Sequence, residues 1–104
     1  MAKVTREAEI TNEFGLHARP AMQLVELASS FQSMVEVSNG TLNVDAKSIM
    51  SVMRLAATKG AKLTITADGQ DAEEACQAIG NLIDQGFGQP EPGQDTDDAD
   101  GSTS

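Results

Sequence analysis

The sequence predicts one α+β domain, an open-faced sandwich in which a four-stranded antiparallel sheet carries three helices on one face. Two patterns predict this fold. Four segments alternate apolar and polar residues as half-buried strands do, and three segments repeat apolar residues at helical spacing. They follow one another as strand, helix, strand, strand, helix, strand and helix, in a chain of 104 residues that suits a single core.

The first strand and first helix lie on either side of a turn. The strand is expected over residues 3–11, where one side of the alternation consists of Val4, Ala8 and Ile10. After the turn-like residues 12–15, a helix should begin just after His17, and Pro20 suits its first turn. Its apolar stripe is Ala21, Leu24, Val25, Ala28 and Phe31.

The middle of the chain predicts a hairpin followed by a short helix. Two alternating runs meet at Asn39-Gly40, a dipeptide suited to the positive backbone angles of a tight turn, so these strands should be antiparallel neighbours. The next apolar segment predicts a helix over about Ile49 to Leu55. The hydroxyl of Ser48 is placed to cap its first amides.

The last strand and helix complete the domain, which we expect to span residues 1–87. Lys62 to Ala67 alternates as a strand, and Asp71 with Glu74 is a plausible capping box for the following helix. That helix has the stripe Ala72, Ala75, Cys76, Ile79, Leu82 and Ile83. Gly86 and Gly88 can end it. Residues 88–104 are acidic and lack large apolar side chains, so they predict a disordered tail.

Charge and composition exclude several classes of function. A net charge of −9 disfavours nucleic acid and anionic membranes as partners, since both require a basic surface. The sequence shows neither a signal peptide nor a long hydrophobic span. Cys76 is the only cysteine and lies on an apolar stripe, which favours a buried thiol in a reducing compartment. A cytoplasmic monomer is therefore expected.

The segment GLHARPA, residues 15–21, carries the chemistry. An imidazole is a good nucleophile near neutral pH and a good leaving group once phosphorylated, so His17 suits reversible phosphoryl transfer. The start of a helix offers backbone amides to an anion, here those of Ala18 and Arg19. The guanidinium of Arg19 can add a fixed positive charge.

A plainer interpretation of this segment is that His17 merely caps the helix while Arg19 is solvated. Metal binding and hydrolysis are poorly supported, because one histidine and one cysteine make no ligand cluster and no acid–base pair flanks a nucleophile. No metal and no cofactor are expected.

GLHARPA, together with SNG, AKSIMSVMRL and TITADGQDAEEA, resembles the HPr family of histidine phosphocarriers in the bacterial phosphotransferase system, over residues 3–87. The resemblance implies the HPr-like fold and places the phosphorylated histidine at His17 and the active-site arginine at Arg19. It implies that enzyme I phosphorylates His17 and that an enzyme IIA-type domain receives the group in sugar uptake. The chain would then be a carrier and not an enzyme.

The resemblance also matches Ser48 to the serine that HPr kinase/phosphorylase modifies. A phosphate there would add about two negative charges beside the site. The short second helix cannot bury all its apolar residues, so a docking patch for partners is expected among Ile49, Met50 and Met53. Two positions depart from the family: Arg54 replaces a small or polar residue, and Ala56 replaces a frequent glycine.

Two other functions remain open at the level of sequence. One is a regulatory binding protein controlled by the state of Ser48, although a pure regulator would not need His17. The other is a carrier in a nitrogen-related or incomplete phosphotransfer chain without sugar permeases, in which His17 acts but the acceptor is a regulator.

Overall fold

A computed structural model of the chain describes residues 3–88. The elements are β1 (Lys3–Glu9), α1 (Ala18–Ser29), β2 (Met34–Ser38), β3 (Asn43–Asp45), α2 (Ile49–Met53), β4 (Lys62–Asp68), α3 (Ala72–Asp84) and a 3-10 turn, η1 (Gly86–Gly88). The predicted order of strands and helices is confirmed. Apart from Gly88, the predicted acidic tail lies outside the described residues.

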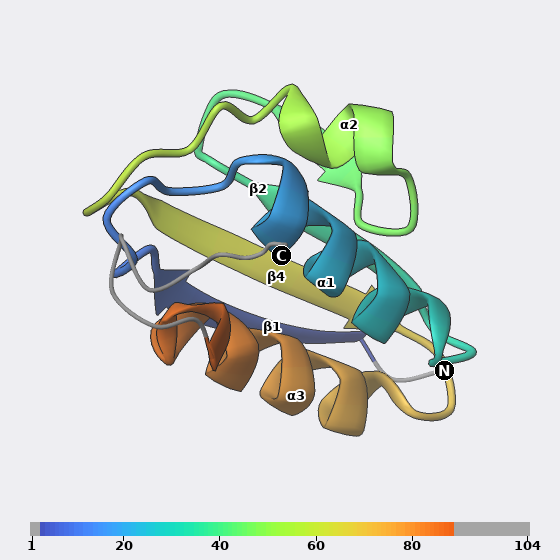
Figure 1. Cartoon of the computed structure of the whole chain (residues 1–104). Helices are drawn as coiled ribbons and strands as arrows, with labels where there is room; N and C mark the ends of the chain where they lie inside the picture. Colours follow the sequence, from blue (N-terminus) through green and yellow to red (C-terminus); the bar gives the residue numbers. More distant parts are fainter. Residues whose placement is uncertain (1–2, 89–104) are drawn as a thin grey trace, which may run out of the picture.

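The four strands form one sheet in the order β1-β4-β2-β3, and every neighbouring pair is antiparallel. The helices α1 and α3 lie side by side across one face of this sheet, and α2 lies beside α1 (Figure 1). The predicted open-faced sandwich is therefore confirmed. No helix within residues 3–88 is long and apolar enough to cross a membrane.

The core lies between the sheet and the helices. Because side chains alternate along a strand, β4 buries Leu63, Ile65 and Ala67 and turns Thr64 and Thr66 toward the open face. The helix α1 supplies Leu24 and Ala28, and the opposing surface of α3 consists of Ala72, Ala75, Cys76, Ile79 and Ile83. The stripes read from the sequence thus mark the core, although Val25, Phe31 and Leu82 are only partly buried.

Three predicted boundaries differ from the structure. The strand β1 ends at Glu9, although Ile10 remains buried and its N–H donates to the Ala61 carbonyl (2.9 Å). The connection of β2 to β3 spans residues 39–42 and not the dipeptide Asn39-Gly40 alone, although the two strands are antiparallel neighbours as predicted. The side-chain oxygen of Asn39 accepts the N–H groups of Thr41 and Leu42, and of the dipeptide only Gly40 has a positive φ, 95°. The helix α2 ends at Met53 and not at Leu55.

The predicted capping box at the start of α3 is wrong as well. Asp71 is the N-cap residue, but its side chain makes no capping hydrogen bond. The carboxylate instead accepts the N–H groups of Gln32 and Ser33, both at 2.9 Å, and the Ser33 hydroxyl. These hydrogen bonds, that of the hydroxyl foremost, lower the pKa of the Asp71 carboxyl. Asp71 therefore ties the start of α3 to the loop that follows α1.

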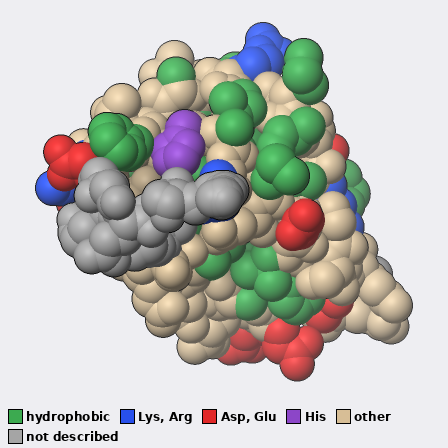
Figure 2. Space-filling view, viewed as in Figure 1, with side chains coloured by type: hydrophobic (Ala, Val, Ile, Leu, Met, Phe, Trp, Pro, Cys, Tyr) green, Lys and Arg blue, Asp and Glu red, His purple; other side chains and the backbone are tan. Residues whose placement is uncertain are grey.

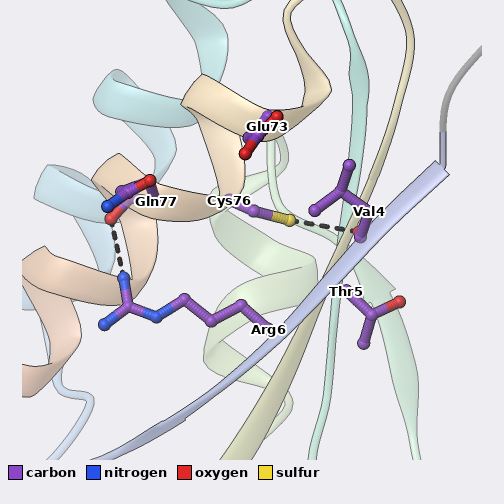
Figure 3. A pocket seen from close by; sticks show the side chains of 6 residues that line it. All are labelled: Val4, Thr5, Arg6, Glu73, Cys76 and Gln77. Carbon is purple, nitrogen blue, oxygen red and sulfur yellow. Dashed lines mark hydrogen bonds between the residues drawn. The ribbon is translucent and has the colours of Figure 1, made fainter.

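Side chains of β1 contact α3, and residues of both elements line a pocket (Figure 3). Arg6 donates to the Gln77 carbonyl (2.8 Å) and to the carboxylate of Asp84 (2.9 Å). It crosses α3 at Gly80, where a Cβ atom would collide with the guanidinium. Cys76 donates to the Val4 carbonyl (3.1 Å), and burial raises the pKa of this thiol.

Candidate phosphoryl-transfer site

His17 occupies the N-cap position of α1, with an extended backbone conformation (φ −92°, ψ −168°). Its carbonyl accepts the first intrahelical hydrogen bond, from the N–H of Ala21 (2.9 Å). Its side chain makes no capping hydrogen bond and is partly exposed. The backbone of His17 therefore starts the helix, while the imidazole stays available for chemistry at the surface.

The loop before His17 is fixed by hydrogen bonds on both sides of Gly15. The Asn12 side-chain amide donates to the Gly15 carbonyl (2.7 Å), and the N–H of Leu16 donates to the Ala57 carbonyl (2.9 Å). Gly15 has a φ of 69°, and a Cβ atom there would lie 2.5 Å from the carbonyl oxygen of Ala57. Only glycine fits this position, because any side chain would push the loop away from its support.

The first turn of α1 places Ala18 and Arg19 at the surface directly after His17. The first amides of a helix point toward its N-terminus and create a positive potential there, which is the side on which His17 lies. Pro20 is buried in this turn, and its missing N–H costs the helix nothing at that position. The first turn thus combines backbone dipoles and one guanidinium beside a histidine.

Ser48 is the N-cap residue of α2, as expected. Its hydroxyl oxygen accepts the N–H of Ser51 (3.3 Å), and its carbonyl accepts the N–H of Val52 (2.9 Å). The neighbouring Lys47 reaches back to the loop after α1 and donates its ammonium to the Phe31 carbonyl (2.8 Å). Ser48 is partly buried, and the helix that it starts packs against α1.

Exposed hydrophobic side chains lie on both sides of the histidine, over the start of α1 and over α2 (Figure 2). Met50 and Met53 are 76% and 40% exposed, whereas Ile49 is partly buried against the core. Of the three residues expected to form a patch, two are therefore at the surface. We use the name hydrophobic surface for the exposed residues Phe14, Met22, Met50 and Met53.

Sequence reasoning missed Phe14 and Met22. Phe14 is 67% exposed, and its ring lies edge-on to the His17 imidazole, with ring centroids 6.3 Å apart and an angle of 80° between the planes. Periodicity gives no information within a turn, so Phe14 carried no signal beyond being an aromatic residue in a loop. Met22 lies off the apolar stripe of α1, and that position does predict its exposure.

Within residues 3–88, no group of three or more His, Cys, Asp or Glu side chains is arranged to hold a metal ion. Near the site, Lys59 and Glu13 form an exposed ion pair at 3.4 Å, which contributes little to stability.

Comparison with known proteins places this site in a family. A family model described as the PTS HPr component phosphorylation site matches residues 4–85. The phosphocarrier protein HPr of Cupriavidus necator is 46% identical over 86 residues, which cover 83% of this chain and 97% of that protein. The phosphocarrier protein HPr of Neisseria meningitidis is 43% identical over 83 residues, 80% of this chain and 93% of that protein.

Solved structures agree with the sequence comparisons. The crystal structure of HPr from Thermoanaerobacter tengcongensis superposes with a TM-score of 0.76 at 43% sequence identity, covering 86% of this chain and 99% of that chain. Both the family model and the relatives span nearly all the described residues. The chain therefore belongs to the HPr family, and it is a phosphocarrier of the phosphotransferase system and not an enzyme.

Proposed function

We propose that His17 is the residue that carries the phosphoryl group, accepting it from phospho-enzyme I and passing it to an enzyme IIA-type domain in sugar uptake. Enzyme I and IIA domains are the partners of the family in general. The observation that carries the assignment is the position and exposure of the imidazole. It stands at the N-terminus of α1, partly exposed, and does not cap the helix.

Transfer through His17 needs only one bond to form and one to break. A ring nitrogen of the imidazole attacks the phosphorus atom, and the new P–N bond forms as the bond between phosphorus and the donor breaks. The same steps run in reverse order when an acceptor nucleophile attacks the phosphohistidine. Since the chain gains and loses the same group, it ends each cycle unchanged.

Arg19 and the first amides of α1 stabilise the phosphoryl oxygens in this proposal. The amides of Ala18 and Arg19 lie at the positive end of a twelve-residue helix, directly after His17. The guanidinium of Arg19 adds a positive charge and paired hydrogen-bond donors. Both contributions act on the negatively charged oxygens of the phosphoryl group and not on the attacking nitrogen of the imidazole.

Partners dock on the hydrophobic surface together with Ile49. Methionine side chains adapt to different contact shapes, which suits a carrier that must bind a donor and several acceptors in turn. The exposure of Met50 and Met53 on α2, next to α1, supports this role.

Ser48 is a regulatory phosphorylation site for an HPr kinase/phosphorylase. Ser48 is partly buried at the start of α2, and its capping role is compatible with modification because a phosphate also accepts backbone amides. The added charge would lie on the helix that contributes Met50 and Met53, and would act on docking.

Residues 1–87 form the working unit, a monomer in the cytoplasm with an acidic tail from residue 88 onward. The residues proposed for transfer and docking all come from one chain, and the buried free thiol of Cys76 suits a reducing compartment.

Onward transfer tests the carrier role. The protein is phosphorylated with phosphoenolpyruvate and a bacterial enzyme I, separated from both, and mixed with a purified IIA domain. We expect the phosphate to leave this chain and appear on the IIA domain. Retention of the phosphate by this chain, with the IIA domain shown to accept phosphate from another HPr, would contradict the proposed role.

A further inference from the structure

Phe14 is the aromatic neighbour of the His17 imidazole within residues 3–88. The centroid distance of 6.3 Å and the interplanar angle of 80° describe an edge-to-face pair, the geometry that aromatic rings prefer. The Phe14 ring is nevertheless 67% exposed, so it adds little to the core. A large apolar side chain that is exposed and touches the reactive residue calls for an explanation other than folding.

Hydrogen bonds hold the backbone that carries Phe14 in a defined turn. The residues on either side of it belong to the turn in which the N–H of Gly15 donates to the Asn12 carbonyl (3.2 Å) and the Asn12 side chain donates to the Gly15 carbonyl (2.7 Å). Leu16, two positions on, is 4% exposed and anchored to Ala57. The turn therefore presents the Phe14 ring from a fixed position and not from a loose loop.

The imidazole of His17 lacks the restraint that an N-cap side chain usually has. A capping side chain is held by a hydrogen bond to an amide of the first turn, and His17 makes no such bond. Its side chain is partly exposed, so packing alone does not select one ring orientation. The edge-to-face contact with Phe14 supplies a restraint on the rotation of the imidazole.

From this geometry we infer that Phe14 is a positioning residue for phosphoryl transfer: it holds the His17 imidazole in the orientation that meets the incoming phosphorus atom. The inference rests on the proposed role of His17 and deepens it. In-line attack needs a ring nitrogen aligned with the bond that breaks, and a ring that rotates freely is aligned for only part of the time. Removal of the Phe14 ring should therefore slow the transfer step more than it weakens docking.

The variants Phe14→Ala and Phe14→Tyr test this role, with Met34→Ala as the matched control. Met34 is also an exposed apolar residue, 71% exposed, but it lies on β2, paired with Asp68 of β4, and not in the turn before His17. Two quantities are measured for each protein: the NMR chemical shifts of the His17 ring protons, and kcat and KM for phosphorylation by enzyme I. Amide spectra of the sheet residues verify that each variant is folded.

We expect Phe14→Ala to move the His17 ring-proton shifts toward those of an unstructured peptide and to lower kcat by about tenfold, with a smaller change in KM. Phe14→Tyr, which keeps the ring, should restore both, and Met34→Ala should match the original protein. Unchanged ring-proton shifts, or a raised KM with kcat unchanged, would overturn the inference and leave Phe14 as a docking residue only. If active enzyme I failed to label the original protein, the proposed function would fail, and the chemical shifts alone would still report whether the contact exists.

Discussion

Two residues with a positive φ, Gly15 and Ala56, lie in the two loops that are joined by the hydrogen bond from Leu16 to Ala57, next to His17. Gly15 has a φ of 69° and packs its Cα against the carbonyl of Ala57. Ala56 has a φ of 48°, a left-handed conformation that places the Cβ atom of an L-residue too close to the backbone. An alanine at position 56 thus adds strain next to Ala57, which supports the loop before His17.

Ala56→Gly should therefore stabilise the protein. Relief of the left-handed strain outweighs the extra entropy of glycine in the unfolded chain, so the free energy of unfolding should rise by about 0.5–1 kcal/mol. Urea unfolding followed by circular dichroism measures it. Ala61→Gly is the control, because Ala61 is not among the residues of positive φ and the same change there should destabilise. A loss of stability in Ala56→Gly would contradict the conformational argument.

Among single residues, some features of the candidate site could be predicted from the sequence and others could not. The positions of His17, Arg19 and Ser48 at the starts of α1 and α2 could be predicted, because short motifs mark where these helices begin. The contact of Phe14 with His17 could not, because it depends on the rotation of two side chains at a turn. Periodicity predicts which face of a helix is buried, as for Met22, but it does not tell which exposed residues lie together.

At the level of elements, the start of α3 was predicted at the correct residue, but the hydrogen bonds predicted for it were wrong. Asp71 does precede α3, but its carboxylate accepts hydrogen bonds from Gln32 and Ser33 on the loop after α1. The capping rule considers local partners only, whereas the fold brings a loop 38 residues away within reach. The carboxylate of Asp71 therefore joins α3 to the loop after α1 and does not cap α3.

Asp71→Asn should remove a pH-dependent part of the stability. The hydroxyl of Ser33, followed by the N–H of Gln32, holds the pKa of Asp71 below its ordinary value of 3.8, so the contribution is present above about pH 4 and is lost as the pH falls through the lowered pKa. The variant should be less stable than the original protein at pH 7, and the difference should shrink in acid.

Urea unfolding at pH 7 and at several values below pH 4 measures the effect of Asp71→Asn. Glu74→Gln is the control, because Glu74 lies exposed in the first turn of the same helix. A constant difference between Asp71→Asn and the original protein at every pH would show that the ionised carboxylate does not stabilise the loop.

For the whole molecule, the order of elements and the pairing of β2 with β3 could be predicted, but the other neighbours in the sheet could not. The sequence alternation marks the strands, yet the order β1-β4-β2-β3 pairs the first strand with the last, and this follows from long-range packing. The crossing of Arg6 over Gly80 has the same origin, since it joins residues at opposite ends of the domain. The site benefits from this arrangement, because α1 and α2 pack together beside His17.

Ser48→Asp should slow phosphorylation of His17 by enzyme I without unfolding the protein. Aspartate is also a good N-cap residue, so α2 should persist, while the new negative charge lies on the helix that carries Met50 and Met53. Ser48→Ala is the control, which loses about 1 kcal/mol of capping energy but keeps the charge unchanged. Initial rates of transfer measure the effect, and equal rates for Ser48→Asp and the original protein would remove the regulatory claim.

The central claim is that His17 carries the phosphoryl group. Its most direct test is intact mass spectrometry of the original protein and of His17→Ala after incubation with phosphoenolpyruvate and enzyme I, before and after brief acid treatment. We predict one phosphate on the original protein, lost in acid as expected for phosphohistidine, and none on a folded His17→Ala. An acid-labile phosphate on His17→Ala would contradict the account, as would an unlabelled original protein when the same enzyme I phosphorylates another HPr.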